Sequence, residues 1–131
     1  MSSHVPLLKT NLRRRAIHML LALGIAYSLF VLAAAIFQRR LIYFPRTIPP
    51  ALAEPAAAEL GFVPWRNPSG QIIGWKLPAT SSPVASVLIT HGNAGCAIDR
   101  GYLAGPIHDA APVDVYVLEY PGYGSREGSP D

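Results

Sequence analysis

The longest uncharged run in the chain covers residues 16–37 and reads AIHMLLALGIAYSLFVLAAAIF. A helix of about 22 residues rises about 33 Å, which matches the hydrocarbon core of a bilayer. Arginines at positions 13–15 precede the run and Arg39 and Arg40 follow it, so their long side chains can reach lipid headgroups on both sides. We therefore assign residues 16–38 to a transmembrane helix that acts as a signal anchor, with the lipid bilayer as its partner.

A cleaved signal peptide is the alternative for the same run. A basic start, an apolar stretch and the alanines at 33–35 could form a processing site. The run is longer than a typical signal-peptide core, and cleavage there would leave Ile36 and Phe37 at the mature start. We therefore favour the anchor.

The distribution of charge limits the possible partners. Residues 1–15 form a basic tail without a carboxylate, whereas residues 39–131 carry seven basic and eight acidic side chains. The net charge of +3 therefore comes from the tail, and the folded part offers no basic surface for nucleic acid. Four basic residues before the apolar run and three close behind it give a small bias, from which we expect a single-pass protein with its N-terminus inside.

The rest of the chain divides into a connector and a folded part. Residues 39–59 are rich in proline and alanine, which predicts an extended, semi-rigid linker. From Leu60 onward, two short apolar runs flank the turn-forming residues 67–70, Asn-Pro-Ser-Gly, and so predict an antiparallel hairpin.

A βαβ unit is expected after the hairpin. Residues 84–90 (VASVLIT) and 113–120 (VDVYVLEY) are rich in strand-forming residues, and a helix-length stretch over residues 97–110 lies between them. Such a unit joins parallel strands, so the fold class is α/β. We expect Pro106 to kink the helix or end it early. We also expect the strand at 113–120 to form a free edge of the sheet.

The glycine-rich loop HGNAG, residues 91–95, lies between the first of these strands and the helix. Gly92 and Gly95 can relieve steric limits on φ, so the backbone N–H of Asn93 or Ala94 can face an anion. An oxyanion hole, a phosphate site and an ordinary turn all fit this pattern, although no Walker or dinucleotide-binding motif is present.

Two motifs together carry a resemblance to a known family. HGNAG followed by EYPGYGSREGSPD (119–131) resembles the HGNAGN and DYRGYGxSxGxPSE pair of the serine aminopeptidase-like branch of the α/β-hydrolases. The segment QRRLIYFP (38–45) is similar to the L-I-Y-x-P segment that follows the membrane helix in many members of that branch. The sequence departs from the family pattern in carrying Pro121 in place of the usual arginine and Cys96 in place of the second asparagine.

The resemblance implies roles for the residues of both motifs. The backbone of Asn93, with Ala94 as the second choice, would supply one oxyanion N–H. His91, with Gly92 and Gly95, would order the loop. A tight turn beside the active site would be formed by Gly122, Tyr123 and Gly124.

The catalytic nucleophile of that family has no match in these residues. No serine lies in a G-x-S-x-G motif, and His91 precedes the position at which the triad begins. Cys96 is expected to be a small buried side chain, and as a lone cysteine it offers neither a disulfide nor a paired metal ligand. We expect no cofactor and no metal.

The domain of residues 60–131 is therefore interpreted as the N-terminal portion of an α/β-hydrolase, truncated before its nucleophile elbow. When complete, the protein would act on a small ester or amide substrate. The alternative is a non-catalytic membrane-anchored interaction or scaffold protein.

Overall fold

The computed structural model describes the backbone of residues 5–130 and the side chains of residues 11–130. The chain divides between Gln38 and Arg39 into two compact units. The first unit consists of most of helix α1, Val5–Ile42. The helix extends further at both ends than the expected 16–38, since Pro6 lies in its first turn, where proline is tolerated, and residues 38–42 contain neither glycine nor proline.

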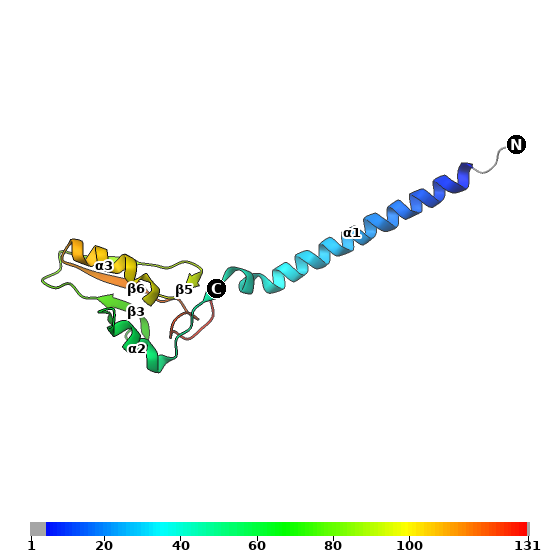
Figure 1. Ribbon diagram of the computed structural model, residues 1–131. Coiled ribbons are helices and arrows are strands. Elements are labelled where there is room, and N and C mark those ends of the chain that lie inside the picture. The colour runs from blue at the N-terminus through cyan, green and yellow to red at the C-terminus, as the bar shows by residue number, and fades with distance from the viewer. Residues whose placement is uncertain (1–4, 131) are drawn as a thin grey trace. The chain divides into compact units, whose positions relative to one another are not determined.

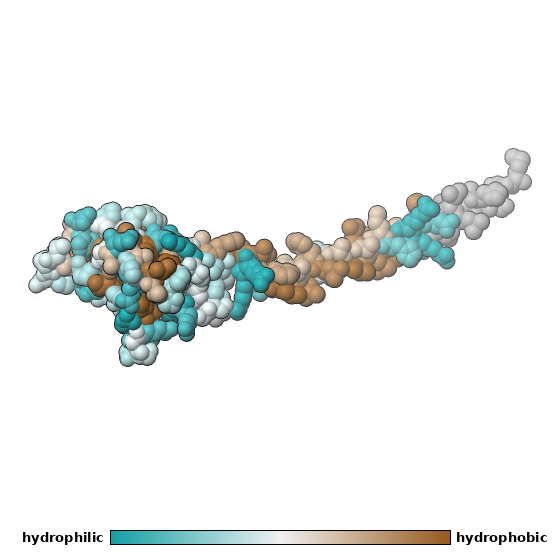
Figure 2. Space-filling view, turned by 60° about the horizontal axis from the view of Figure 1, so that its bottom comes forward, coloured by the Kyte–Doolittle hydropathy of each residue, from teal (hydrophilic) through white to brown (hydrophobic). Residues whose placement is uncertain are grey.

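Helix α1 is long and apolar enough to cross a membrane. The stretch Asn11–Ile42 has a mean hydropathy of 2.5 over its most apolar window, and none of that window is buried within the protein. Figure 2 shows a hydrophobic surface along this helix with a hydrophilic band at either end. A helix that is apolar on all sides without protein cover is typical of a lipid-facing segment.

The segment expected to be an extended linker, residues 39–59, is instead part of the folded unit. It contains the end of α1, the short strand β1, Phe44–Pro45, and helix α2, Pro50–Ala58 (Figure 1). A proline at the first position of α2 suits a helix start, and alanine has the highest helix propensity. Ala53 and Ala57 are four residues apart and fully buried, so the prediction of an extended linker was wrong because these alanines form a helix face that packs in the core.

A four-stranded mixed sheet forms the centre of the second unit. Its strands are β2, Val63–Arg66; β3, Ile72–Leu77; β4, Ala85–Ile89; and β6, Val113–Leu118, in the order β2-β3-β6-β4. Strands β2 and β3 form the expected antiparallel hairpin. In its turn, Asn67 Oδ1 accepts hydrogen bonds from the backbone N–H groups of Ser69 and Gln71, at 3.1 and 2.9 Å.

The βαβ unit is confirmed, because β4 and β6 are parallel with Ala85 opposite Val113 and Ile89 opposite Val117. The connection contains the short strand β5, Ala94–Gly95; the 3₁₀ helix η1, Ile98–Arg100; and helix α3, Gly101–Ala110. Pro106 lies inside α3, which continues to Ala110, so the helix does not end early there.

The strand at 113–120 was expected to be a free edge, but the two edge strands of the sheet are β2 and β4. Strand β6 is central, pairing with β3 on one side and with β4 on the other. Val115 and Val117 are fully buried, whereas Leu88 of β4 is 59% exposed. In this central position the valines of β6 are removed from water, which stabilises the arrangement.

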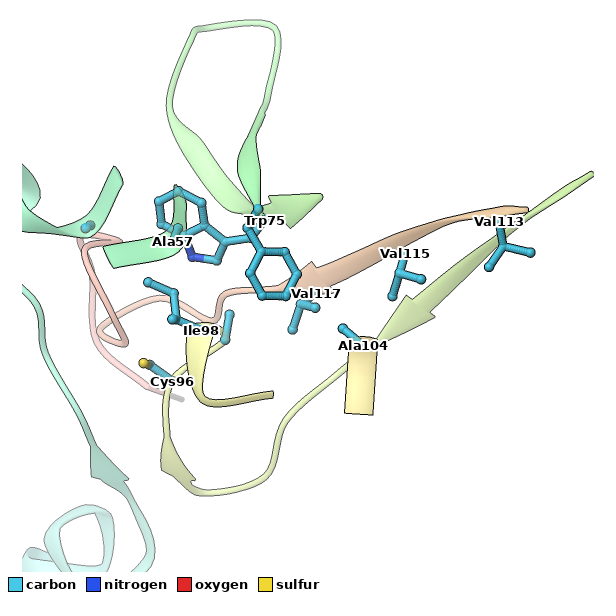
Figure 3. Packing of buried hydrophobic residues seen from close by; sticks show 11 residues of the cluster. Ala57, Trp75, Cys96, Ile98, Ala104, Val113, Val115 and Val117 are labelled. Carbon is cyan, nitrogen blue, oxygen red and sulfur yellow. The ribbon is translucent and has the colours of Figure 1, made fainter. Parts of the chain in front are cut away.

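The core lies on one face of β6. Val113, Val115 and Val117 point to the same side of the strand, toward Ala104 of α3, and Trp75 of β3 extends the cluster (Figure 3). Alternate residues of β6 face the other side of the sheet, where Tyr116 makes an edge-to-face contact with Trp65 at 5.0 Å between ring centroids.

The contribution of residues 39–59 to the core can be tested by deletion. A chain that begins at Leu60 lacks β1 and α2, so β5 loses its partner strand and the buried positions of Ala53 and Ala57 are left empty. We expect this chain to aggregate or to show no cooperative thermal transition by circular dichroism, and a chain that begins at Arg39 to melt cooperatively. A monomeric, cooperative melt of the shorter chain would contradict the structural role of α2.

Candidate functional site

The loop His91–Gly95 lies where the sequence predicted, between β4 and the helical segment that begins at Ile98. His91 is buried, whereas Gly92, Asn93 and Ala94 are exposed. Gly95 has a φ of +82°, so its expected conformational role is confirmed. Gly92 has no positive φ and open space beside its Cα, so the expectation that it relieves backbone strain was wrong.

His91 fixes the orientation of one peptide group in this loop. Its Nδ1 lies 2.9 Å from the carbonyl oxygen of Gly92. That carbonyl belongs to the same planar peptide group as the N–H of Asn93, which therefore points in the opposite direction. The Asn93 N–H donates to no acceptor among residues 5–130. The Asn93 N–H therefore has a fixed orientation and is free to donate a hydrogen bond to a ligand.

The next peptide group is held by two other contacts. The carbonyl oxygen of Asn93 accepts hydrogen bonds from the Phe44 N–H and from the Tyr123 hydroxyl, both at 2.8 Å. The N–H of Ala94 belongs to this peptide group and points away from both donors. The N–H groups of Asn93 and Ala94, the two oxyanion donors proposed from the sequence, thus point in different directions.

Glu119 forms a buried pair with His91. Glu119 Oε1 lies 3.1 Å from His91 Nε2 and also accepts a hydrogen bond from the Ala97 N–H at 3.0 Å. Both side chains are almost completely shielded from solvent. Glu119 Oε2 has no hydrogen-bond partner among the described residues. A Cβ on Gly124 would overlap this carboxyl group, so only glycine fits at that position of the turn.

The hydrogen bond between His91 and Glu119 needs one more proton than a neutral histidine and an ionised carboxylate carry together. Because Nδ1 must donate to the Gly92 carbonyl, the Nε2 of a neutral His91 is an acceptor. Glu119 Oε1 must then carry a proton that it donates to Nε2, or His91 must be charged. Burial raises the pKa of Glu119 to about 7 and lowers the pKa of His91, so both shifts favour the neutral pair with a protonated Glu119.

The turn after β6 is packed against the loop. Gly122 and Gly124 have φ values of +80° and +54°. The ring of Tyr123 makes an edge-to-face contact with His91 at 4.9 Å between centroids, and the ring of Tyr120 does the same at 4.8 Å. The turn from Gly122 to Gly124 therefore lies against the loop that contains His91.

A pocket of about 280 Å³ opens beside these contacts. Its lining is mostly aromatic and proline side chains with the backbone of the loop, and comprises Tyr43, His91, Gly92, Asn93, Tyr120, Pro121, Tyr123, Ser129 and Pro130. Asn93 lines the pocket and Ala94 does not, which favours Asn93 as the amide that could meet a ligand.

Several lining residues were missed from the sequence. Tyr43 was assigned to the linker, and nothing in its local pattern predicts that the linker returns to the loop. Ser129 also lines the pocket, although it lies outside any G-x-S-x-G motif. It is exposed, and none of the described residues pairs it with a histidine, so it lacks the base that an activated serine needs.

Cys96 is fully buried, as expected. Burial raises the pKa of its thiol to about 11, so the sulfur is protonated at neutral pH and unreactive. Its N–H donates to Asp99 Oδ2 at 2.9 Å, and Asp99 also forms an ion pair with Arg46, next to β1. Within residues 11–130 no three His, Cys, Asp or Glu side chains gather as metal ligands.

No family model and no solved structure matches the chain. It is 36% identical over 95 residues to the uncharacterized proteins MT2364 and Rv2307c from two strains of Mycobacterium tuberculosis, an alignment that covers 71% of this chain. The chain spans about a third of the length of these curated relatives, since the alignment covers 34% of each.

The shared proton predicts a pH dependence of stability. The pKa of Glu119 is raised from 4.5 to about 7, so the folded chain keeps a proton that the unfolded chain loses between these values. This stabilisation is fully present below about pH 4.5 and is lost as the pH rises through about 7. The lowered pKa of His91 acts in the opposite direction, with stability lost as the pH falls below the usual histidine value.

The variant Glu119→Gln separates the contribution of Glu119 to the pH dependence of stability from that of His91, because it removes the carboxyl group and keeps the histidine. In the wild type, the protonated Oε1 of Glu119 both donates to His91 and accepts from the Ala97 N–H. Neither the oxygen nor the nitrogen of a glutamine amide can do both, so one hydrogen bond is lost and we expect this variant to be destabilised by about 1–3 kcal/mol at pH 5. The difference from the wild type should shrink toward pH 8, as measured by thermal unfolding in detergent. Glu127→Gln, an exposed control, should follow the wild type. Parallel pH profiles for the wild type and Glu119→Gln would contradict the shared proton.

Proposed function

We propose that this chain is the anchored N-terminal part of a serine hydrolase of the α/β-hydrolase fold, serine aminopeptidase-like branch, that acts on ester or amide bonds. The observation that carries the proposal is the Asn93 N–H. It lines the pocket, its peptide group is oriented by His91, and no acceptor among the described residues uses it. A fixed, unpaired amide is what stabilises the oxyanion of a tetrahedral intermediate.

The position of the loop in the sheet supports this proposal. Strand β4 is the third strand of the four-stranded sheet in chain order, and the loop follows it directly. In α/β-hydrolases one oxyanion N–H comes from the loop after the third strand, and the other from the residue after the nucleophile. Asn93 would be the first of these donors.

His91 supports the oxyanion donor without acting as the general base. Both of its ring nitrogens are engaged, one with the Gly92 carbonyl and the other with Glu119, and its side chain has no exposed surface. A general base must reach the proton that it removes. The nucleophile, acid and base of the proposed reaction therefore have no matching residues in this chain, and we expect it to be inactive by itself.

The proposal places the protein in a membrane as a single-pass protein. Residues 16–38 of α1 would span the bilayer, with the N-terminus inside and the hydrolase-like part across it. The uncovered apolar surface of α1 and the arginines at its ends support the span.

A non-catalytic interaction protein is the second candidate, and the free edge of β4 favours it. Val84 and Leu88 are 75% and 59% exposed beside unpaired backbone groups, and such an edge can pair with a strand from another chain. Under this reading the pocket would have no catalytic role.

The DNA that follows the codon for Asp131 separates the two candidates. We expect it to encode, in frame or after a frameshift, a G-x-S-x-G motif followed by an acid and then a histidine. DNA without such a continuation in any frame would favour the interaction protein.

The oxyanion role predicts opposite results for two substitutions in the complete hydrolase. Asn93→Pro removes the backbone N–H and should lower kcat on p-nitrophenyl butyrate by about 10²–10³-fold. Asn93→Ala keeps the N–H and should retain most of the activity. Thermal unfolding of both variants checks that each remains folded. Equal activities for two folded variants would show that this N–H is not an oxyanion donor.

A further inference from the structure

The segment between the apolar run and the pocket carries large exposed apolar side chains. Leu41 and Ile42, in the last turn of α1, are 63% and 46% exposed, and Phe44 of β1 is 61% exposed. Tyr43, between them, is half-buried and lines the pocket. Arg39 and Arg40 lie in the same last turn of the helix. Apolar side chains next to basic ones are typical of segments that lie in the bilayer interface.

Phe44 is rigidly connected to the candidate site. Its N–H donates to the Asn93 carbonyl at 2.8 Å, and β1 pairs with β5 in parallel with Phe44 opposite Ala94. The next residues are also held, because the Arg46 N–H donates to the Gly95 carbonyl at 2.9 Å. The position of Phe44 relative to the bilayer therefore determines how far the pocket lies from the bilayer surface.

The chain is too short to carry Phe44 far from the bilayer. About seven residues separate Phe37, the last residue of the uncharged run, from Phe44, and most of them are helical. At about 1.5 Å per helical residue and about 3.4 Å per extended residue, the path is about 15 Å long. The headgroup layer itself is about 5–8 Å thick on each side.

We propose that Leu41, Ile42 and Phe44 form a contact of the folded unit with the lipid surface, and that this contact holds the pocket at the bilayer surface. Insertion of these side chains removes their apolar area from water. Arg39 and Arg40 at the same level are attracted by anionic headgroups. The proposal rests on the membrane span proposed above, and it does not require hydrolase activity.

Nitroxide labels on single cysteines test this contact in the full chain. The chain carries Cys96→Ala and is reconstituted in vesicles of phosphatidylcholine and phosphatidylglycerol. A label at Phe44→Cys should be accessible to oxygen and shielded from a water-soluble nickel chelate. A label at Leu88→Cys, a position with a matched exposure of 59%, should show the opposite, with a several-fold lower ratio of oxygen to nickel accessibility.

A third label, at Tyr27→Cys inside the apolar run, separates failure of the contact from failure of the span. If position 27 is in lipid while position 44 is as accessible to nickel as position 88, the contact is refuted and the span stands. If position 27 is in water, the span is refuted and the contact with it. Shielding of position 88 as well as position 44 would also refute the contact, because an edge of the four-stranded sheet would then touch lipid and the contact would not be confined to residues 41–44.

Discussion

One proton shared between His91 and Glu119 determines the conformation of the candidate site. Nδ1 of His91 is committed to the Gly92 carbonyl, so the bond between Nε2 and Glu119 Oε1 is satisfied only when the pair carries this proton. Burial favours the arrangement in which the carboxyl group holds it. The same oxygen accepts from the Ala97 N–H, so the end of β6 is connected both to the loop and to the start of the helical segment.

The second determinant is the return of the chain from the end of α1 to the loop. Strand β1 pairs with β5, and the backbone continues alongside the turn after β6, where Gly124 donates to the Arg46 carbonyl and accepts from the Ile48 N–H. Three segments that are distant in sequence are thereby joined by backbone hydrogen bonds. The pocket is built where they meet, and its lining includes Tyr43 from the first, Asn93 from the second and Tyr123 from the third.

The local elements of the fold were largely predictable. The apolar run, the hairpin, the parallel βαβ unit and the glycine-rich loop each follow from a pattern within a few residues, and the structure contains all of them. Cys96 was expected to be buried because a free cysteine usually behaves as a small apolar side chain, and it is fully buried. The prediction for residues 39–59 was wrong because the same local sequence is compatible with two structures. The alanines of residues 51–58 fit an exposed connector or a buried helix face, and only the presence of a core to cover decides between them.

Sequence by itself determined which residues could meet an anion and which helix could enter a membrane, because glycine conformation and hydrophobic length are local properties. Tertiary structure alone decided that β6 is central and β4 is an edge strand, since the antiparallel hairpin pairs with β6 through contacts between residues about 40 apart. It also decided between Asn93 and Ala94. Which amide remains free depends on where His91, Phe44 and Tyr123 place their hydrogen-bonding atoms, and these residues come together only when the chain is folded.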